Sequence, residues 1–192
     1  MEEKSVHHKV YNKIKVTIMD VRKFLHRYNR GDRNFVGVIL HRADLSGCTL
    51  SGIDFSQADL SGVDLRGANL TRANLKYANL TNADLTDADL SGAHLEEVNL
   101  IGAALKGANL VGSNLIRADL RSADLERANL QGANLSDATV NSANLRGVNL
   151  SGACLDGVDL TDVDLTDKAL APVAEATTST ASGTSRHWVT WN

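Results

Sequence analysis

The aspartates are the residues of this chain whose number and spacing could do chemistry. Asp44, Asp64 and Asp84 lie 20 positions apart, and after an interruption at Ala104 the same register continues with Asp124 and, near the end, Asp164. If the fold stacked every twentieth residue, these carboxylates would form a column with a spacing of about 4.8 Å, which could gather cations. The alternative is that each side chain hydrogen-bonds to its own backbone, as Asp and Asn often do. The fold therefore decides between a cation site and a structural role.

The other reactive side chains lack the neighbours that catalysis or metal binding requires. His94 has no second histidine at ligand spacing, and no base is expected beside Ser113. The sequence contains no phosphate-binding loop of the Walker type. If every twentieth residue stacks, Cys48 and Cys154 would lie roughly 25 Å apart, which is too far for a disulfide. We therefore predict no catalytic residue, no metal site and no cofactor.

The elements that must position these side chains follow from a period of five. A large apolar residue, nearly always Leu, occupies every fifth position from Phe35 to Leu165, and the residue two before most of these centres is small and apolar. Because positions i and i−2 share one face of an extended segment, each unit predicts a very short strand with two inward side chains. Asp or Asn between them faces outward. Gly recurs two residues after the centre, where a type II turn needs a positive φ. At Arg72, Tyr77, Asn82 and Asp87 we expect a different turn or some strain.

These units resemble the pentapeptide-repeat family. Segments such as Ala68-Asn69-Leu70-Thr71-Arg72 and Ala88-Asp89-Leu90-Ser91-Gly92 match its A-[DN]-L-x-x motif, and the run of Leu centres is similar to the cyanobacterial form. The resemblance covers about two-thirds of the chain. It implies an all-β fold, a right-handed quadrilateral β-helix with four units per coil, and a rod of roughly 32 Å. We therefore predict a solenoid over residues 35–167, an N-terminal helical segment over 1–34 and a low-complexity tail over 168–192.

The segment from Val6 to Tyr28 has the apolar spacing of an amphipathic helix, with basic residues on its other face. We predict that it caps the open first coil of the solenoid. The apolar side chains expected to make this cap are Ile14, Ile18, Val21 and Leu25. Two alternatives stay open, a self-pairing coiled coil and a basic helix on an anionic membrane surface.

A few apolar side chains are predicted to face outward, where a protein partner could contact them. Ile101, Val111 and Ile116 occupy corner positions, and the tail carries the two tryptophans, Trp188 and Trp191. An uncovered last coil would also expose strand edges, so an end-to-end homodimer is a further expectation.

Charge and composition narrow the function. Residues 1–35 carry a net charge of +5 and residues 36–167 a net charge of −9. The filled interior predicts a non-enzymatic scaffold or interaction module, with no direct nucleic-acid binding. A second hypothesis comes from the resemblance, since some members inhibit DNA gyrase by mimicking DNA; here the charge is about one per 3.6 Å of rod, against about one per 1.7 Å in DNA. The two thiols and the absence of a signal core predict a cytoplasmic protein.

Overall fold

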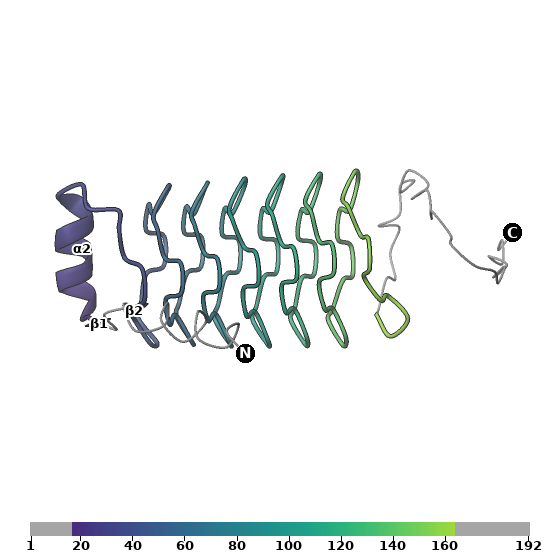
Figure 1. The fold of residues 1–192 in the computed structure, drawn as a ribbon, viewed down its shortest axis with the longest axis horizontal. Coiled ribbons are helices and arrows are strands. Elements are labelled where there is room, and N and C mark those ends of the chain that lie inside the picture. Colours follow the sequence, from purple (N-terminus) through teal and green to yellow (C-terminus); the bar gives the residue numbers. More distant parts are fainter. Residues whose placement is uncertain (1–16, 164–192) are drawn as a thin grey trace, which may run out of the picture.

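A rod of stacked coils with one helix at its N-terminal end forms the molecule (Figure 1). The computed structural model describes residues 17–163. Its regular elements are β1 (Thr17–Ile18), α2 (Val21–Asn29) and β2 (Val38–Ile39), and β1 pairs in parallel with β2. No helix within residues 17–163 has the length and apolar character needed to cross a membrane. The predicted tail over residues 168–192 lies outside the described residues.

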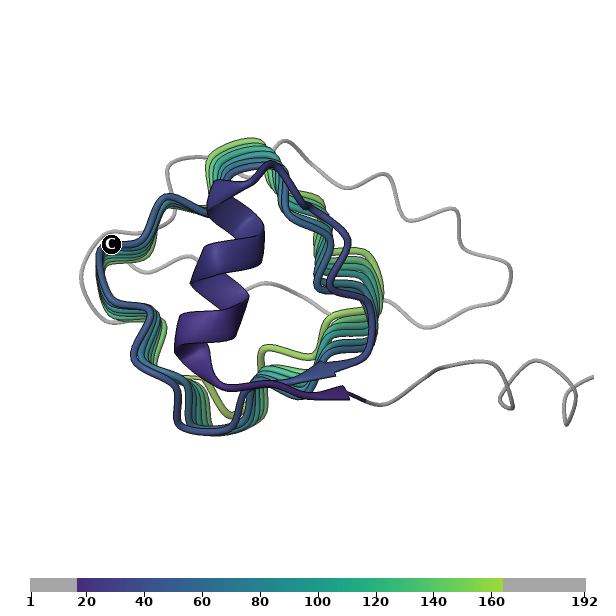
Figure 2. The ribbon, with the colours of Figure 1, turned by 90° about the vertical axis from the view of Figure 1, so that its left-hand side faces the viewer.

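Single parallel β-bridges join the coils along the whole rod. They connect residues 20 apart, from Asn34 with Asp54 to Asn134 with Cys154. Because each unit has five residues, four units complete one coil, and the end-on view shows a four-sided outline (Figure 2). Backbone hydrogen bonds run both ways between coils: the N–H of Leu60 donates to the next coil, and the N–H of Asp59 donates to the previous one. The predicted solenoid with four units per coil is confirmed.

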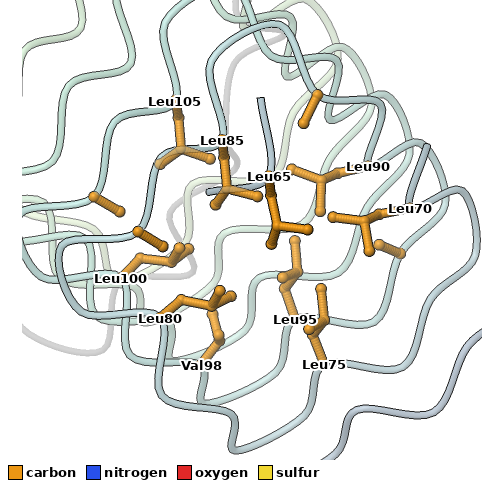
Figure 3. Close-up of a cluster of buried hydrophobic side chains, with 14 of the residues drawn as sticks. Leu65, Leu70, Leu75, Leu80, Leu85, Leu90, Leu95, Val98, Leu100 and Leu105 are labelled. Atoms are coloured by element: carbon orange, nitrogen blue, oxygen red, sulfur yellow. The ribbon is translucent and has the colours of Figure 1, made fainter. Parts of the chain in front are cut away.

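The central residue of each unit, nearly always leucine, fills the interior of the rod. From Leu45 to Leu130 every central side chain is at most 1% exposed, and the small residues two positions earlier lie beside them. Figure 3 shows these leucines meeting along the axis, with those of successive coils stacked. Burying one such side chain contributes about 1.5–3 kcal/mol. The prediction of a solid apolar spine is therefore confirmed.

The corner turns keep one backbone conformation whether or not they contain glycine. From residue 37 to residue 157, the third residue of each turn has a positive φ, and the fourth residue's N–H donates to the carbonyl of the first. Arg72, Tyr77, Asn82 and Asp87 have φ values of 55–60°. The structure therefore keeps the turn and accepts strain, which costs about 1 kcal/mol for each residue with a Cβ.

The N-terminal helix is shorter than the apolar spacing predicts. Thr17 and Ile18 are β-branched and extend the edge of the first coil as a strand, where Met19 N–H also donates to Ile39 O. Asp20 then acts as N-cap, accepting from Lys23 N–H at 3.0 Å, and α2 begins at Val21. The prediction of one helix from Val6 to Tyr28 is wrong over Thr17–Ile18, because an unpaired strand edge outcompetes helix formation there.

Helix α2 lies across the open end of the rod (Figure 2), where a cap was expected. Val21 and Leu25, two of the side chains expected to make the cap, are partly buried and pack against the core. The prediction for Ile18 is wrong, since it belongs to β1 and is 83% exposed. Ile14 lies outside the described residues. The main contact comes instead from Phe24, which is fully buried, and from Tyr28.

Candidate functional site

The outward Asp and Asn side chains hold the corner turns. Asp44 Oδ1 accepts a hydrogen bond from Ser46 N–H at 3.1 Å, and Asn69 Oδ1 accepts one from Thr71 N–H at 3.0 Å. The same contact recurs along the rod. Some amides also bond between coils, as Asn74 Nδ2 does to Asp54 Oδ1 at 3.2 Å. The structure therefore supports the alternative in which these Asp side chains hydrogen-bond to nearby backbone groups.

The acidic column is partly neutralised by an arginine. Arg66 Nε lies 2.9 Å from Asp64 Oδ1 and 3.7 Å from Asp84 Oδ2. This guanidinium lowers the pKa of Asp64, and the hydrogen bonds from Ser46 lower the pKa of Asp44. Within residues 17–163 no group of three or more His, Cys, Asp or Glu side chains is arranged to hold a metal ion.

The side chains considered for catalysis lie apart from one another. Ser113 is buried, and its hydroxyl donates to Leu110 O at 2.8 Å, so it supports a turn. His94 Nδ1 lies 3.6 Å from Glu96 Oε1 on the surface. Cys48 and Cys154 are both free thiols. Burial raises the pKa of Cys48, which lowers the fraction of this thiol present as the reactive thiolate. At none of these residues do a nucleophile, a base and a concave site occur together.

The predicted partner contacts do not form one patch. Ile101, Val111 and Ile116 are each half-buried and occupy three different corners of the rod. Trp188 and Trp191 lie outside the described residues. The structure instead exposes Tyr77, whose exposed fraction is 55%, at a corner position. Sequence reasoning did not single it out as a contact, although an aromatic residue where glycine usually stands was the available signal.

One corner column differs from the others and is here named the tyrosine edge. It consists of the exposed residues at the third turn position on five successive coils: Gln57, Tyr77, Glu97, Arg117 and Asp137. The preceding corner column, here named the glycine edge, has Arg72 as its one residue with a side chain at that position among the described coils. The members of the glycine edge are Gly52, Arg72, Gly92, Gly112, Gly132 and Gly152. The rod is therefore structurally periodic but chemically different on its several sides.

Ion pairs between coils order the side chains on and near these corners. Lys76 Nζ lies 3.1 Å from Glu96 Oε1, and Asn114 Nδ2 donates to the same oxygen at 2.8 Å. Arg117 and Glu97 approach to 3.9 Å on the tyrosine edge and are both well exposed. Exposed pairs of this kind add little stability. Their consequence is to fix charged groups at known positions on the outer surface.

Comparison with known proteins gives the family. Residues 39–76, 53–92, 93–132 and 123–167 match the model for pentapeptide repeats, with eight copies. A search of curated proteins found no significant match.

Several solved structures are similar to this chain. A pentapeptide-repeat protein from the cyanobacterium Cyanothece 51142 (Rfr23) is 35% identical over 73% of this chain and 92% of its own, with a TM-score of 0.38. HetL from the cyanobacterium Nostoc, described as involved in heterocyst differentiation regulation, is 30% identical over 77% of this chain and 95% of its own, with a TM-score of 0.24. QnrB1, a plasmid-mediated fluoroquinolone resistance protein, is 24% identical over 69% of this chain and 73% of its own, with a TM-score of 0.33. The model and the identity to Rfr23 show that this chain belongs to the pentapeptide-repeat family, for which a right-handed β-helix is the implied fold.

Proposed function

We propose that the protein is a non-enzymatic scaffold or protein-interaction module that acts through the outer faces of its β-helix. The observation that carries this proposal is the filled interior, since the central side chains from Leu45 to Leu130 are at most 1% exposed. An enzyme needs a concave site with converging polar groups. The chemistry available to another molecule therefore lies on the corners and the outward strand positions.

The architecture suits the display of side chains at fixed spacing. Successive coils hold equivalent positions about 4.8 Å apart, and the hydrogen-bonded ladder leaves little freedom between them. Pairs such as Lys76–Glu96 and Lys106–Glu126 orient charged groups along the rod. A partner would therefore meet an ordered pattern, which lowers the entropy lost on binding. The free thiols of Cys48 and Cys154 favour a reducing compartment, and we infer a cytoplasmic protein.

The DNA-mimic alternative gains no support from the charge arrangement. A mimic of duplex DNA needs rows of unpaired anionic groups, whereas Arg66 and Arg121 hydrogen-bond the adjacent Asp64 and Asp119. The glycine edge adds no acidic side chain of its own. Inhibition of DNA gyrase supercoiling by micromolar protein would reverse this judgement, and we expect none.

The membrane alternative conflicts with the packing of α2. A helix lying on a bilayer inserts its apolar face into the lipid. In α2 that face carries Phe24 and Tyr28, which are buried against the rod. Co-sedimentation with anionic vesicles, compared for the full chain and for a chain lacking residues 1–30, tests the alternative. We expect no binding that depends on those residues.

Affinity capture from the native host tests the proposal itself. The full chain serves as bait beside two variants with equal charge change on different edges, Arg117→Glu and Lys106→Glu. A partner that binds the wild-type rod, and loses binding with one variant but not with the other, supports an interaction module. Reproducible turnover of a substrate by purified protein would contradict it.

A further inference from the structure

The tyrosine edge holds large side chains where the fold favours glycine. Its residues have φ values between 55° and 60°, a region in which a side chain costs about 1 kcal/mol. Each of the five positions is exposed, so none of these side chains contributes to the core. On the glycine edge the same turn forms without this cost at every described position except Arg72. Seven other non-glycine residues have a positive φ, but they are spread over three other corners, so the tyrosine edge is the corner where this strain recurs on five successive coils.

The order of side chains along the edge is self-complementary. Reading toward the C-terminus, the edge presents Gln57, Tyr77, Glu97, Arg117 and Asp137. Two antiparallel copies related by a two-fold axis between the coils of Glu97 and Arg117 would place each Glu97 opposite Arg117 of the second copy. The same operation places Tyr77, a hydroxyl donor, opposite the carboxylate of Asp137. A two-fold interface requires this reciprocity, in which residue i meets j and j meets i.

The charged groups are free to make such contacts. Arg117 and Glu97 lie 3.9 Å apart within one rod, and their side chains are 65% and 45% exposed, so each retains room for a second partner. No ion pair of Asp137 occurs within residues 17–163, and its carboxylate lies over the corner of Gly157. The alternating signs of Glu97, Arg117 and Asp137 do not suit a polyanion such as nucleic acid or an anionic membrane.

From this complementarity we propose that the tyrosine edge is a docking surface for a second copy of the chain, which forms a lateral antiparallel dimer. The proposal builds on the interaction module proposed above and names one of its surfaces. The edge spans roughly 19 Å along the axis, so the contact area is small. Interfaces of this size are weak and transient, and we expect association only at high protein concentration.

Charge reversal on the full chain tests the dimer. Sedimentation velocity over a wide concentration range should show reversible dimerisation of the wild-type protein. Arg117→Glu and Glu97→Arg each place like charges opposite one another twice, so either should weaken dimerisation by about tenfold or more. The double variant restores both pairs and should dimerise again. A mixture of the two single variants should form heterodimers, because every Glu then faces an Arg.

The control is Lys106→Glu, which changes the charge by the same amount at another corner, where Lys106 pairs with Glu126 across one coil. It should leave dimerisation unchanged, and circular dichroism should show that all variants keep the fold. A wild-type protein that stays monomeric, or a dimer that survives both single variants, would overturn the proposal. A dimer lost with Arg117→Glu but kept with Glu97→Arg would mean that Arg117 faces Asp137, and would overturn this register. Capture of partners by a monomeric wild-type rod would leave the interaction module standing without the dimer.

Discussion

The N-terminal cap and the repeat body solve the same packing problem with different residues. In the body, each central leucine packs against the central residues at the same position in the coils before and after it. Leu70, Leu90 and Leu110 form one such stack. The first coil has no preceding coil. There α2 supplies Phe24, whose ring centroid lies 4.7 Å from that of Phe35 and 5.6 Å from that of Phe55. All three phenylalanines of the chain therefore gather at the cap.

The difference shows what a repeat cannot provide for itself. A leucine suffices where an identical layer follows, because its neighbour fills the remaining space. At the end of the rod one crossing helix must cover a four-sided core, and larger rings fill the gap. Tyr28 and Arg33 extend this cap outward, with the guanidinium 3.8 Å from the ring centroid. Solenoids need such ends because an open coil exposes both apolar side chains and strand edges.

Truncation of Phe24 should cause the largest loss of stability among the variants that compare the cap with the body. Phe24→Ala removes the ring that joins helix to rod, and we expect a loss of about 3–5 kcal/mol in the free energy of unfolding. Urea denaturation measures that loss. Hydrogen exchange should show the first coil opening before the middle of the rod, since the cap protects it.

Two matched variants calibrate that result. Leu90→Ala, in the middle of the body, should cost about 2–5 kcal/mol without selective opening of the first coil. Phe24→Leu places the residue of the body in the cap and should cost about 1–2 kcal/mol, because a leucine there has no second layer to complete it. Equal stability of Phe24→Leu and the wild type would refute the need for a ring.

Two corner glycines in the body of the rod, Gly112 and Gly107, have different surroundings. At Gly112 an added Cβ meets nothing within 4 Å, so Gly112→Ala should cost about 1 kcal/mol from the positive φ alone. At Gly107 the Cβ would overlap Asp87 Oδ1, so Gly107→Ala must also displace that carboxylate. Thermal unfolding of both variants should rank Gly107→Ala as the less stable. Removing the carboxylate with Asp87→Gly should bring the two costs together.

The smallest effect concerns pH. Hydrogen bonds from Arg27 in the cap and Arg66 in the body lower the pKa values of Asp32 and Asp64 below their usual value near 3.9. A lowered pKa stabilises the folded state above the unfolded pKa, and this contribution is lost as pH falls through the folded pKa. Acid should therefore destabilise the protein below about pH 4.

Asparagine variants separate the two regions in that acid range. Asp64→Asn should flatten the pH dependence of the free energy of unfolding. The turn should persist, because Asn69, at the equivalent position of the next unit, holds its own turn through its side-chain amide oxygen. Asp32→Asn should flatten it too, and should also weaken the cap at neutral pH because Asp32 joins Arg27 to Asn34 N–H. Urea denaturation at several pH values measures both. Parallel curves for the variants and the wild type would show that these carboxylates do not drive the acid response.

Much of the rod was predictable because its information is local and repeated. The period of five gives the inward leucines, the outward Asp and Asn, and the corner position, and the structure confirms each. Ser113 was expected to have no base beside it, and in the structure its hydroxyl supports a turn by donating to Leu110 O. The N-terminal boundary of helix α2 was not predictable, because Ile18 fits either the apolar face of a helix or a strand. Only the unpaired edge of the first coil, a neighbour distant in sequence, favours the strand.

The sequence determined that this protein is a solenoid, since a strict period of five turns the same two side chains of every unit inward, and the resemblance to pentapeptide repeats implied four units per coil. The tertiary structure shows that outward residues 20 apart share a side, as four units per coil implies, and it alone shows how far each side chain is exposed. Tyr77, Glu97 and Arg117 are ordinary variable positions in the sequence, and they become one edge only because residues 20 apart stack. It also selected Phe24 as the centre of the cap, because the size of the space at the end of the rod depends on coils that the helix meets only after folding.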